Sequence, residues 1–315
     1  MIKNSIKRNT RRVILILLAL IVSLASVSLP GAAYTQNAYA QDKPSDYIKS
    51  IKYSNIYNSS VRKEVTKALK SAKIPQKDID CFIWNVTDYN KTVRGKGLIK
   101  SGYKTTKKLV PEYDVIKLDS LWQKKYDTFI GNNCRITAFT LMHNKISVKK
   151  SAKDKYMTLF MDKEALSSSP KAVLKGKEKK KFMSFYAPIP AKDSTDSLVQ
   201  ARQIKKYLKK RGVQFKKGKA SLISVYMHSN FSEDENYLFI GHTGVLVKLS
   251  NKKYMFIEKV SFQEPYQALI FDSKAHLNDY LMKKYDVEFG QGNARPIIFE
   301  NGDVIEGYRA NPDNE

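Results

Sequence analysis

The chain has 315 residues, of which 42% are hydrophobic and 27% are charged. This length is enough for one large domain or two small ones with a substantial core, which excludes the class of short scaffolds that need disulfide staples. There are 56 Lys and Arg residues against 30 Asp and Glu residues, a net charge of +26 that favours a polyanionic partner.

The first 40 residues have the pattern of a bacterial export signal. A basic start precedes the apolar residues 13–29, and Ala38-Tyr39-Ala40 provides a cleavage site, with Gly31-Ala32-Ala33 as the alternative. An uncleaved anchor stays open, because residues 13–29 are just long enough to span a bilayer of about 30 Å. We expect cleavage after Ala40, a secreted or cell-surface protein and no stable membrane span afterwards.

The charge that remains after cleavage restricts the partners. The signal holds five basic and no acidic residues, so +21 of the +26 stays on residues 41–315. This favours anionic wall polymers or lipid headgroups. Nucleic acid is not expected, since the chain shows no nucleic-acid-binding signature and is predicted to be exported. A plain solvated, lysine-rich surface is the alternative.

Apolar periodicity predicts helices in the first two thirds of the chain and strands after Gly212. The expected helices cover residues 59–74, 76–90, 118–125, the segment that begins at Cys134, 159–166, 177–186 and 196–211. The expected strands cover residues 220–226, 237–249, 254–261 and 267–271, then a helix over 274–285 and a hairpin of 296–299 with 304–305. Helices followed by an antiparallel sheet indicate the α+β class.

Cys134 is the first candidate nucleophile. Asn132 and Asn133 precede it and are good helix caps, so the thiol is expected in the first helical turn. The positive end of the helix dipole favours the thiolate there. Two alternatives stay open: a buried, inert cysteine, and a disulfide with Cys81.

Four histidines are candidates for the base. His143 is expected at the surface, His276 begins a polar helix, and His228 is a loop residue or an accessory site group. His242 differs, because the segment Gly241-His242-Thr243-Gly244-Val245 places an imidazole in an otherwise apolar strand. A buried ring needs a polar partner, and the flanking glycines allow close approach. A satisfied core histidine is the alternative.

The adjacent strand offers that partner. If the hairpin loop has an odd number of residues, Glu258 lies on the sheet face of His242, opposite it or one pair away. An even loop would bring Lys259 or Ser261 there instead. Gln263 and Glu264, just past the strand, are the fallback partners.

A cysteine that opens a helix, a Gly-His-x-Gly-Val strand and a polar residue on the next strand resemble the papain-like cysteine hydrolases of bacterial walls, the NlpC-type and CHAP groups. The similarity covers about residues 125–270. More closely, the chain resembles an uncharacterised family of exported proteins from Gram-positive bacteria. The stretches that carry this second resemblance are Tyr53-Ser54-Asn55, Asn133-Cys134-Arg135-Ile136-Thr137 and Phe262-Gln263-Glu264-Pro265-Tyr266.

The resemblance implies a helical region over residues 41–125 and a papain-like α+β core over 126–315, with a Lys-rich helical insert at about 148–215. It implies Cys134 as nucleophile, His242 as base and Glu258 as third residue. The oxyanion and substrate candidates are Asn132, Asn133, Arg135 and Gln263, although a salt bridge is the simpler role for Arg135. The neighbours of Cys134 depart from the Asp-Cys-Ser-Gly of NlpC-type proteins, so the substrate is not carried over.

The motifs therefore predict an exported thiol amidase or peptidase that acts on peptidoglycan peptides. No His-Glu-x-x-His, paired-cysteine or glycine-rich phosphate motif occurs, so no metal or cofactor is expected. A non-catalytic surface protein that binds wall polymers or a protein partner is the alternative function.

Overall fold

The structure is a computed structural model that describes residues 45–171, 174–230, 232, 235–287 and 292–314. The expected export signal lies outside the described residues. In the described part, no helix has both the length and the apolar character needed to cross a membrane.

A large antiparallel sheet forms the centre of the described chain, with strand order β11-β10-β6-β7-β8-β9-β1-β2 and β4 paired to β7. A separate short pair joins β3 to β5. The strands are β1 (Ile51–Ser54), β2 (Lys104–Thr106), β3 (Ile146–Ser147), β4 (Ile189–Pro190), β5 (Gln214–Phe215), β6 (Ala220–Asn230), β7 (Asn236–Lys248), β8 (Tyr254–Lys259), β9 (Tyr266–Phe271), β10 (Ile297–Glu300) and β11 (Asp303–Val304).

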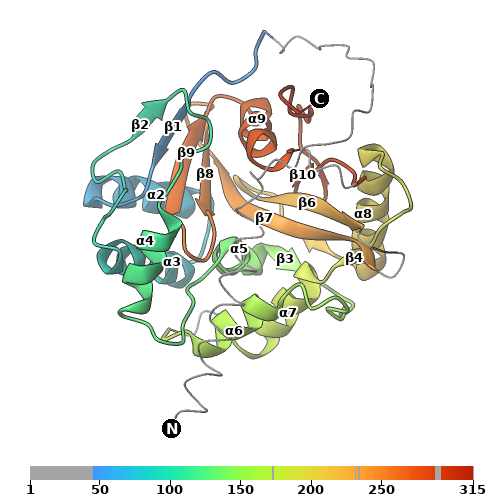
Figure 1. Cartoon of the computed structure of the whole chain (residues 1–315), viewed down its shortest axis with the longest axis horizontal. Helices are drawn as coiled ribbons and strands as arrows, with labels where there is room; N and C mark the ends of the chain where they lie inside the picture. The colour runs from blue at the N-terminus through green and yellow to red at the C-terminus, as the bar shows by residue number, and fades with distance from the viewer. Residues whose placement is uncertain (1–44, 172–173, 231, 233–234, 288–291, 315) are drawn as a thin grey trace, which may run out of the picture. The chain divides into compact units, whose positions relative to one another are not determined.

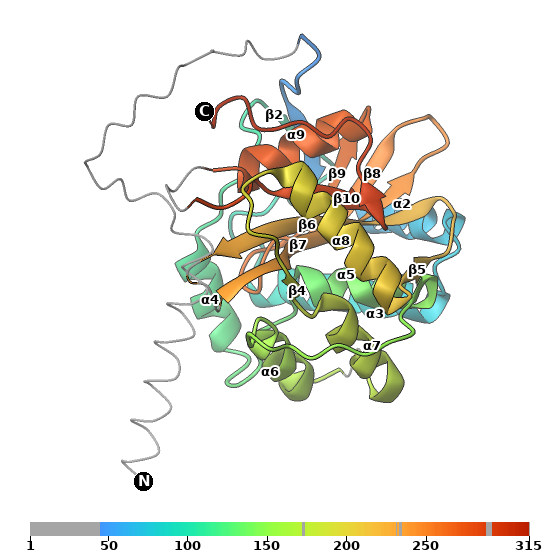
Figure 2. The ribbon, with the colours of Figure 1, turned by 90° about the vertical axis from the view of Figure 1, so that its right-hand side faces the viewer.

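Helices cover both faces of this sheet. In Figures 1 and 2, α9 lies on one face, while α3, α5, α6 and α7 lie on the other. The described helices are α2 (Ser59–Ser71), α3 (Gln76–Thr92), α4 (Val115–Gln123), α5 (Cys134–Met142), α6 (Phe160–Ser168), α7 (Gly176–Tyr186), α8 (Ser197–Arg211) and α9 (Lys274–Tyr285), with a 3₁₀ turn at His143–Lys145.

Local sequence sets the helix ends. The Asn133 side chain caps α5 by accepting from the Ile136 N–H, and Ser273 caps α9 in the same way. α8 ends at Gly212, whose φ of 62° is the left-handed conformation that glycine adopts without steric cost. These ends agree with the sequence pattern, because capping depends on residues within one turn.

The strand β7 carries side chains to two cores. Val245 and Val247 face the core that contains α5, while Leu246 faces the core that contains α9. The β6–β7 register shifts after Val225, which pairs with His242 while Tyr226 pairs with Ile240. Regular alternation from Leu246 puts His242 on the α9 face with Val225, and the irregularity moves Ile240 and Leu238 to the face of α5.

The α+β class is confirmed, since helices and a large antiparallel sheet make up the described chain. Four strands of the described chain, β1 to β4, precede Gly212 and were not expected. Ile51–Ser54 adds to the sheet by pairing with β9, so the region 41–125 is not only helical. Ile189–Pro190 pairs with the start of β7, so the lysine-rich insert also contributes to the sheet. Both strands are short, and short strands carry too little periodicity to be recognised.

Candidate functional site

Cys134 is the first residue of α5 and is 6% exposed. The helix packs against β7 and β8, and its apolar residues Ile136, Phe139 and Leu141 are fully buried. The thiol therefore lies at the N-terminal end of a helix that is fixed on the sheet, where the helix dipole favours an anion.

His242 and Glu258 lie side by side on β7 and β8. The loop between these strands spans residues 249–253, an odd number, and the ladder pairs Val245 with Ile257. Continuing this register puts Glu258 one pair away from His242 on the same face. Nε2 of His242 lies 2.5 Å from Oε2 of Glu258, and both residues are 1% exposed.

Cys134 interacts with the same imidazole through a side-chain hydrogen bond and through charge. Because Glu258 occupies Nε2, the ring nitrogen left for the thiol is Nδ1. The three side chains thus form one chain in the order thiol, imidazole, carboxylate, which is the arrangement that activates a cysteine nucleophile.

The environment favours the charged forms. Burial raises the pKa of the Cys134 thiol, but His242 and the Arg135 guanidinium outweigh burial and bring that pKa below its usual value. Burial lowers the pKa of His242, yet Cys134 and Glu258 raise it to about 9. Burial also opposes ionisation of Glu258, whose pKa is nevertheless lowered by His242. These shifts all favour a thiolate–imidazolium pair beside a carboxylate.

Two tyrosines of α9 complete the site from the face of the sheet that carries the imidazole. The Tyr280 hydroxyl donates to Oε1 of Glu258 at 2.5 Å. The Tyr285 ring stacks on His242 with centroids 5.1 Å apart and planes 27° apart. Sequence reasoning missed both, because α9 reads as an ordinary packing helix.

Arg135 holds the start of α5 in place. Its Nε and Nη2 donate to Asp162 of α6 at 3.0 and 2.5 Å, and its Nη1 donates to the Ile240 carbonyl at 3.0 Å. Ile240 lies two residues before His242, so one guanidinium joins α5 to the strand that carries His242. Arg135 thus forms a salt bridge with Asp162. This salt bridge explains why an arginine lies here, and no substrate carboxylate is needed as its partner.

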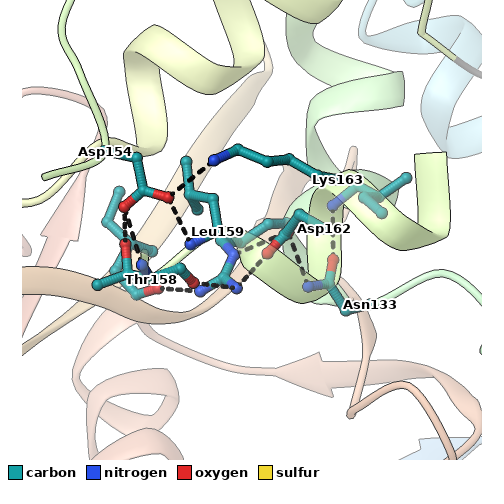
Figure 3. A network of polar contacts seen from close by, with 9 residues as sticks. Asn133, Asp154, Thr158, Leu159, Asp162 and Lys163 are labelled. Carbon is teal, nitrogen blue, oxygen red and sulfur yellow. Dashed lines mark hydrogen bonds and ion pairs between the residues drawn. The ribbon is translucent and has the colours of Figure 1, made fainter. Parts of the chain in front are cut away.

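Asp162 is the centre of this network (Figure 3). It is fully buried and also accepts from Asn133 Nδ2 at 2.9 Å. Asp154 orders the segment just before α6, since its carboxylate accepts from the Thr158 and Leu159 N–H groups at 2.8 and 3.0 Å. The Asp162 carboxylate therefore neutralises the charge of Arg135 within the protein.

The other predicted oxyanion and substrate groups have protein partners. The Asn133 amide bonds Asp162 and the helix end, and Asn132 Nδ2 donates to Asn85 at 3.0 Å. Gln263 contributes its backbone carbonyl, which accepts from the Tyr89 hydroxyl at 2.5 Å. The Asn132 and Asn133 side chains thus position the loop before Cys134, and the Cys134 N–H, in the first turn of α5, has no partner within its own helix.

Lys259 is a second buried group beside the site that the sequence did not single out. Its ammonium donates to the carbonyls of Phe262 and Glu264 and lies 4.0 Å from the Tyr89 ring centroid. Burial lowers the pKa of Lys259 to about 7, against the opposite influence of the charges of Glu264 and Cys134. The lysine holds the 260–265 turn that packs on the loop before Cys134.

The other histidines are structural. His143 was expected at the surface, which is wrong: it is 7% exposed, and its ring lies 3.1 Å from Asp78 and 2.9 Å from Glu178. The helix pattern missed this because both carboxylates come from other helices. His228 is buried too, with Nδ1 accepting from the Ala294 N–H.

Cys81 and Cys134 are both free thiols, so the disulfide alternative does not hold in this structure. Cys81 Sγ lies 3.6 Å from Nδ2 of Asn85. Within the residues that the structure describes, no group of three or more His, Cys, Asp or Glu side chains is arranged to hold a metal ion.

Comparison with known proteins gives one family. A model described as "Domain of unknown function (DUF4300)" matches residues 52–305. No curated protein and no solved structure matches the chain. The matched segment contains Cys134, His242 and Glu258, and it covers more than half of the sequence. The chain therefore belongs to the DUF4300 family.

Proposed function

We propose that this protein is a cysteine hydrolase of the papain-like type that cleaves an amide bond. The observation that carries the proposal is the buried chain from Cys134 through His242 to Glu258 at the start of α5. A structural core histidine needs one partner, whereas this ring has a carboxylate on one side and a thiol of lowered pKa on the other.

The reaction follows from these groups. The Cys134 thiolate attacks the amide carbonyl carbon, and the oxyanion is stabilised by the Cys134 N–H at the positive end of α5. The imidazolium of His242 gives its proton to the leaving nitrogen as the C–N bond breaks, which leaves a thioester. His242 then takes a proton from water, whose oxygen attacks the thioester; the C–S bond breaks and releases the acid and the Cys134 thiolate, which restores the thiolate–imidazolium pair. An amine in place of water would give transpeptidation.

The substrate we propose is a peptidoglycan stem peptide or cross-bridge, and the location is the surface of a Gram-positive bacterium or its medium. The support is the export pattern of residues 1–40 and the large positive charge, which attracts the protein to an anionic wall. No metal or cofactor takes part in the reaction as proposed.

Thiol reactivity tests the proposal directly. Iodoacetamide should alkylate Cys134 rapidly near neutral pH, and His242→Ala should slow this reaction by about 10- to 100-fold because the thiolate loses its counterion. Mass spectrometry distinguishes Cys134 from Cys81, which serves as an internal control because burial raises the pKa of the Cys81 thiol. Equal rates for the two cysteines would refute the hydrolase.

A non-catalytic surface protein is the second candidate, and the 6% exposure of Cys134 is the observation that favours it. This function predicts slow alkylation of the thiol and attachment to cell walls that is sensitive to salt and unchanged in Cys134→Ala. Digestion of isolated peptidoglycan by the wild type but not by Cys134→Ala would exclude it.

A further inference from the structure

The outer face of α2 is hollowed and strongly basic. The hollow is lined by Ser59, Arg62, Lys63, Thr66, Lys67 and Lys70. Four of these six side chains are cationic, the other two carry hydroxyls, and none is acidic. The amide hydrolysis proposed above makes no use of this surface.

The periodicity of α2 explains why these side chains gather on one face. Val61, Val65, Ala68 and Leu69 are buried in the core below the helix. The positions between them therefore face solvent, and they place cations on three successive turns at intervals of about 5.4 Å. Because the helix is fixed by its apolar face, the spacing of the cations is fixed too.

The positive charge of the hollow is not neutralised by its surroundings. Across the described residues, no carboxylate forms an ion pair with Arg62, Lys63, Lys67 or Lys70. The only acidic residue of α2, Glu64, lies near Tyr103, whose pKa is raised by burial first and then by the charge of Glu64. The guanidinium of Arg62 is anchored to the Tyr57 carbonyl.

This pattern fits a linear polyanion better than a single small anion. Cations repeated at about 5.4 Å along a helix face each meet one charge of an extended chain, and binding releases the counterions of both partners. The hydroxyls of Ser59 and Thr66 can donate to phosphate oxygens. Nucleic acid fits less well, because no aromatic side chain lines the hollow to stack on a base.

We propose that the α2 hollow binds a linear polyol-phosphate polymer, the phosphodiester chemistry of an anionic cell wall. The site holds the protein on the wall while the Cys134 centre, on another helix, remains available. Binding is independent of the hydrolase function, so the two can fail separately.

A charge-matched pair of variants tests the site. The α2 variant is Arg62→Gln/Lys63→Gln/Lys67→Gln/Lys70→Gln. The control is Arg202→Gln/Lys206→Gln/Lys209→Gln/Lys210→Gln on α8, and these four side chains are all exposed. α8 lies at the other end of the sheet from α2 (Figure 1). Both variants lose one arginine and three lysines, so any difference between them is due to the site rather than to net charge.

The measurement is the affinity for poly(glycerol phosphate) over a series of salt concentrations, with Cys134→Ala in every protein to exclude cleavage. The α2 variant should bind at least about tenfold more weakly at low salt, with a log–log salt slope smaller by about three, while the control changes about twofold or less. Equal losses in the two variants, or no binding by the parent protein, would overturn the proposal.

Three further probes decide the chemistry of the ligand: inorganic phosphate, vesicles with phosphatidylglycerol, and oligo-dT. The polymer should bind more tightly than each of them per phosphate, and only its binding should depend on α2. If the vesicles or oligo-dT bind more tightly and lose more affinity in the α2 variant, the proposed ligand is wrong. Thermal unfolding should show that both variants are folded at the assay temperature, since only Arg62→Gln removes a polar contact within the described chain, that with the Tyr57 carbonyl.

Discussion

The Tyr280 hydroxyl and the imidazole of His242 contact opposite oxygens of one carboxylate, that of Glu258, each at 2.5 Å. Tyr280 comes from α9, on the sheet face that carries His242, so a helix and the neighbouring strand together hold the Glu258 carboxylate. The carboxylate is fully buried and keeps its charge because both oxygens have partners.

Tyr280→Phe removes one of these partners and should weaken the support for the imidazolium. We expect the pKa of the Cys134 thiol to rise by about 0.5–1 unit, since a hydrogen bond to a charged group contributes about 1.5–3 kcal/mol and part of this reaches the thiol. The pH dependence of iodoacetamide alkylation measures the shift. Tyr226→Phe is the matched control, a buried tyrosine whose raised pKa comes from burial alone; equal shifts in the two variants would show that Tyr280 has no positioning role.

Glu258→Gln keeps the size of the side chain and removes its charge. The pKa of His242, about 9 in the native protein, should fall by at least about one unit, because a nearby opposite charge is lost. Hydrolysis should have a bell-shaped pH profile whose upper limb lies near 9 in the wild type, where the imidazolium loses its proton. In Glu258→Gln this limb should move to lower pH, and an unmoved limb would contradict the assignment.

Asp162→Asn leaves the Arg135 guanidinium buried without its counterion. We expect the free energy of unfolding to fall by about 3–5 kcal/mol, the typical cost of an uncompensated buried charge. The double variant Arg135→Met/Asp162→Leu removes both charges and should be less destabilised than the single one. Urea unfolding of the wild type, Arg135→Met, Asp162→Leu and the double variant gives the coupling energy, and simple additivity would show that the pair is not coupled.

The two glycines that flank His242 should respond differently to alanine. A Cβ on Gly244 would lie 2.4 Å from the Phe256 ring and 2.8 Å from the Ile257 carbonyl oxygen, so Gly244→Ala should cost about 1–3 kcal/mol or more. A Cβ on Gly241 meets only the flexible Met227 side chain, at 2.3 Å from its sulfur. Gly241→Ala should therefore be milder and should be rescued by Met227→Ala; urea unfolding measures both.

Lys259 should make stability depend on pH. Its folded pKa of about 7 lies below the ordinary 10.5, so between these values the unfolded chain binds more protons and stability rises with pH. The wild type should thus lose stability relative to Lys259→Met as the pH falls from 10 to 7, by at most about 1.4 kcal/mol per pH unit. If the difference in unfolding free energy between the two proteins stays constant over this range, the pKa of Lys259 is not lowered in the folded protein.

The sequence by itself determined the local features of this protein. The capped start of α5 at Cys134, the end of α8 at Gly212 and the extent of α9 follow from residues within a turn or two, because capping and periodicity are short-range. Because side chains alternate along β7 and β8, the sequence also limited the partner of His242 to Glu258, for an odd loop, or Lys259 or Ser261, for an even one. The family resemblance favoured Glu258.

Only the tertiary structure decided which of these features meet. The five-residue loop after β7 set the parity that puts Glu258 beside His242. Tyr280, Tyr285 and Asp162 reach the site from α9 and α6, and the two carboxylates beside His143 come from α3 and α7. Contacts between distant segments depend on how the segments pack, and this packing cannot be read from the local sequence pattern of any one segment.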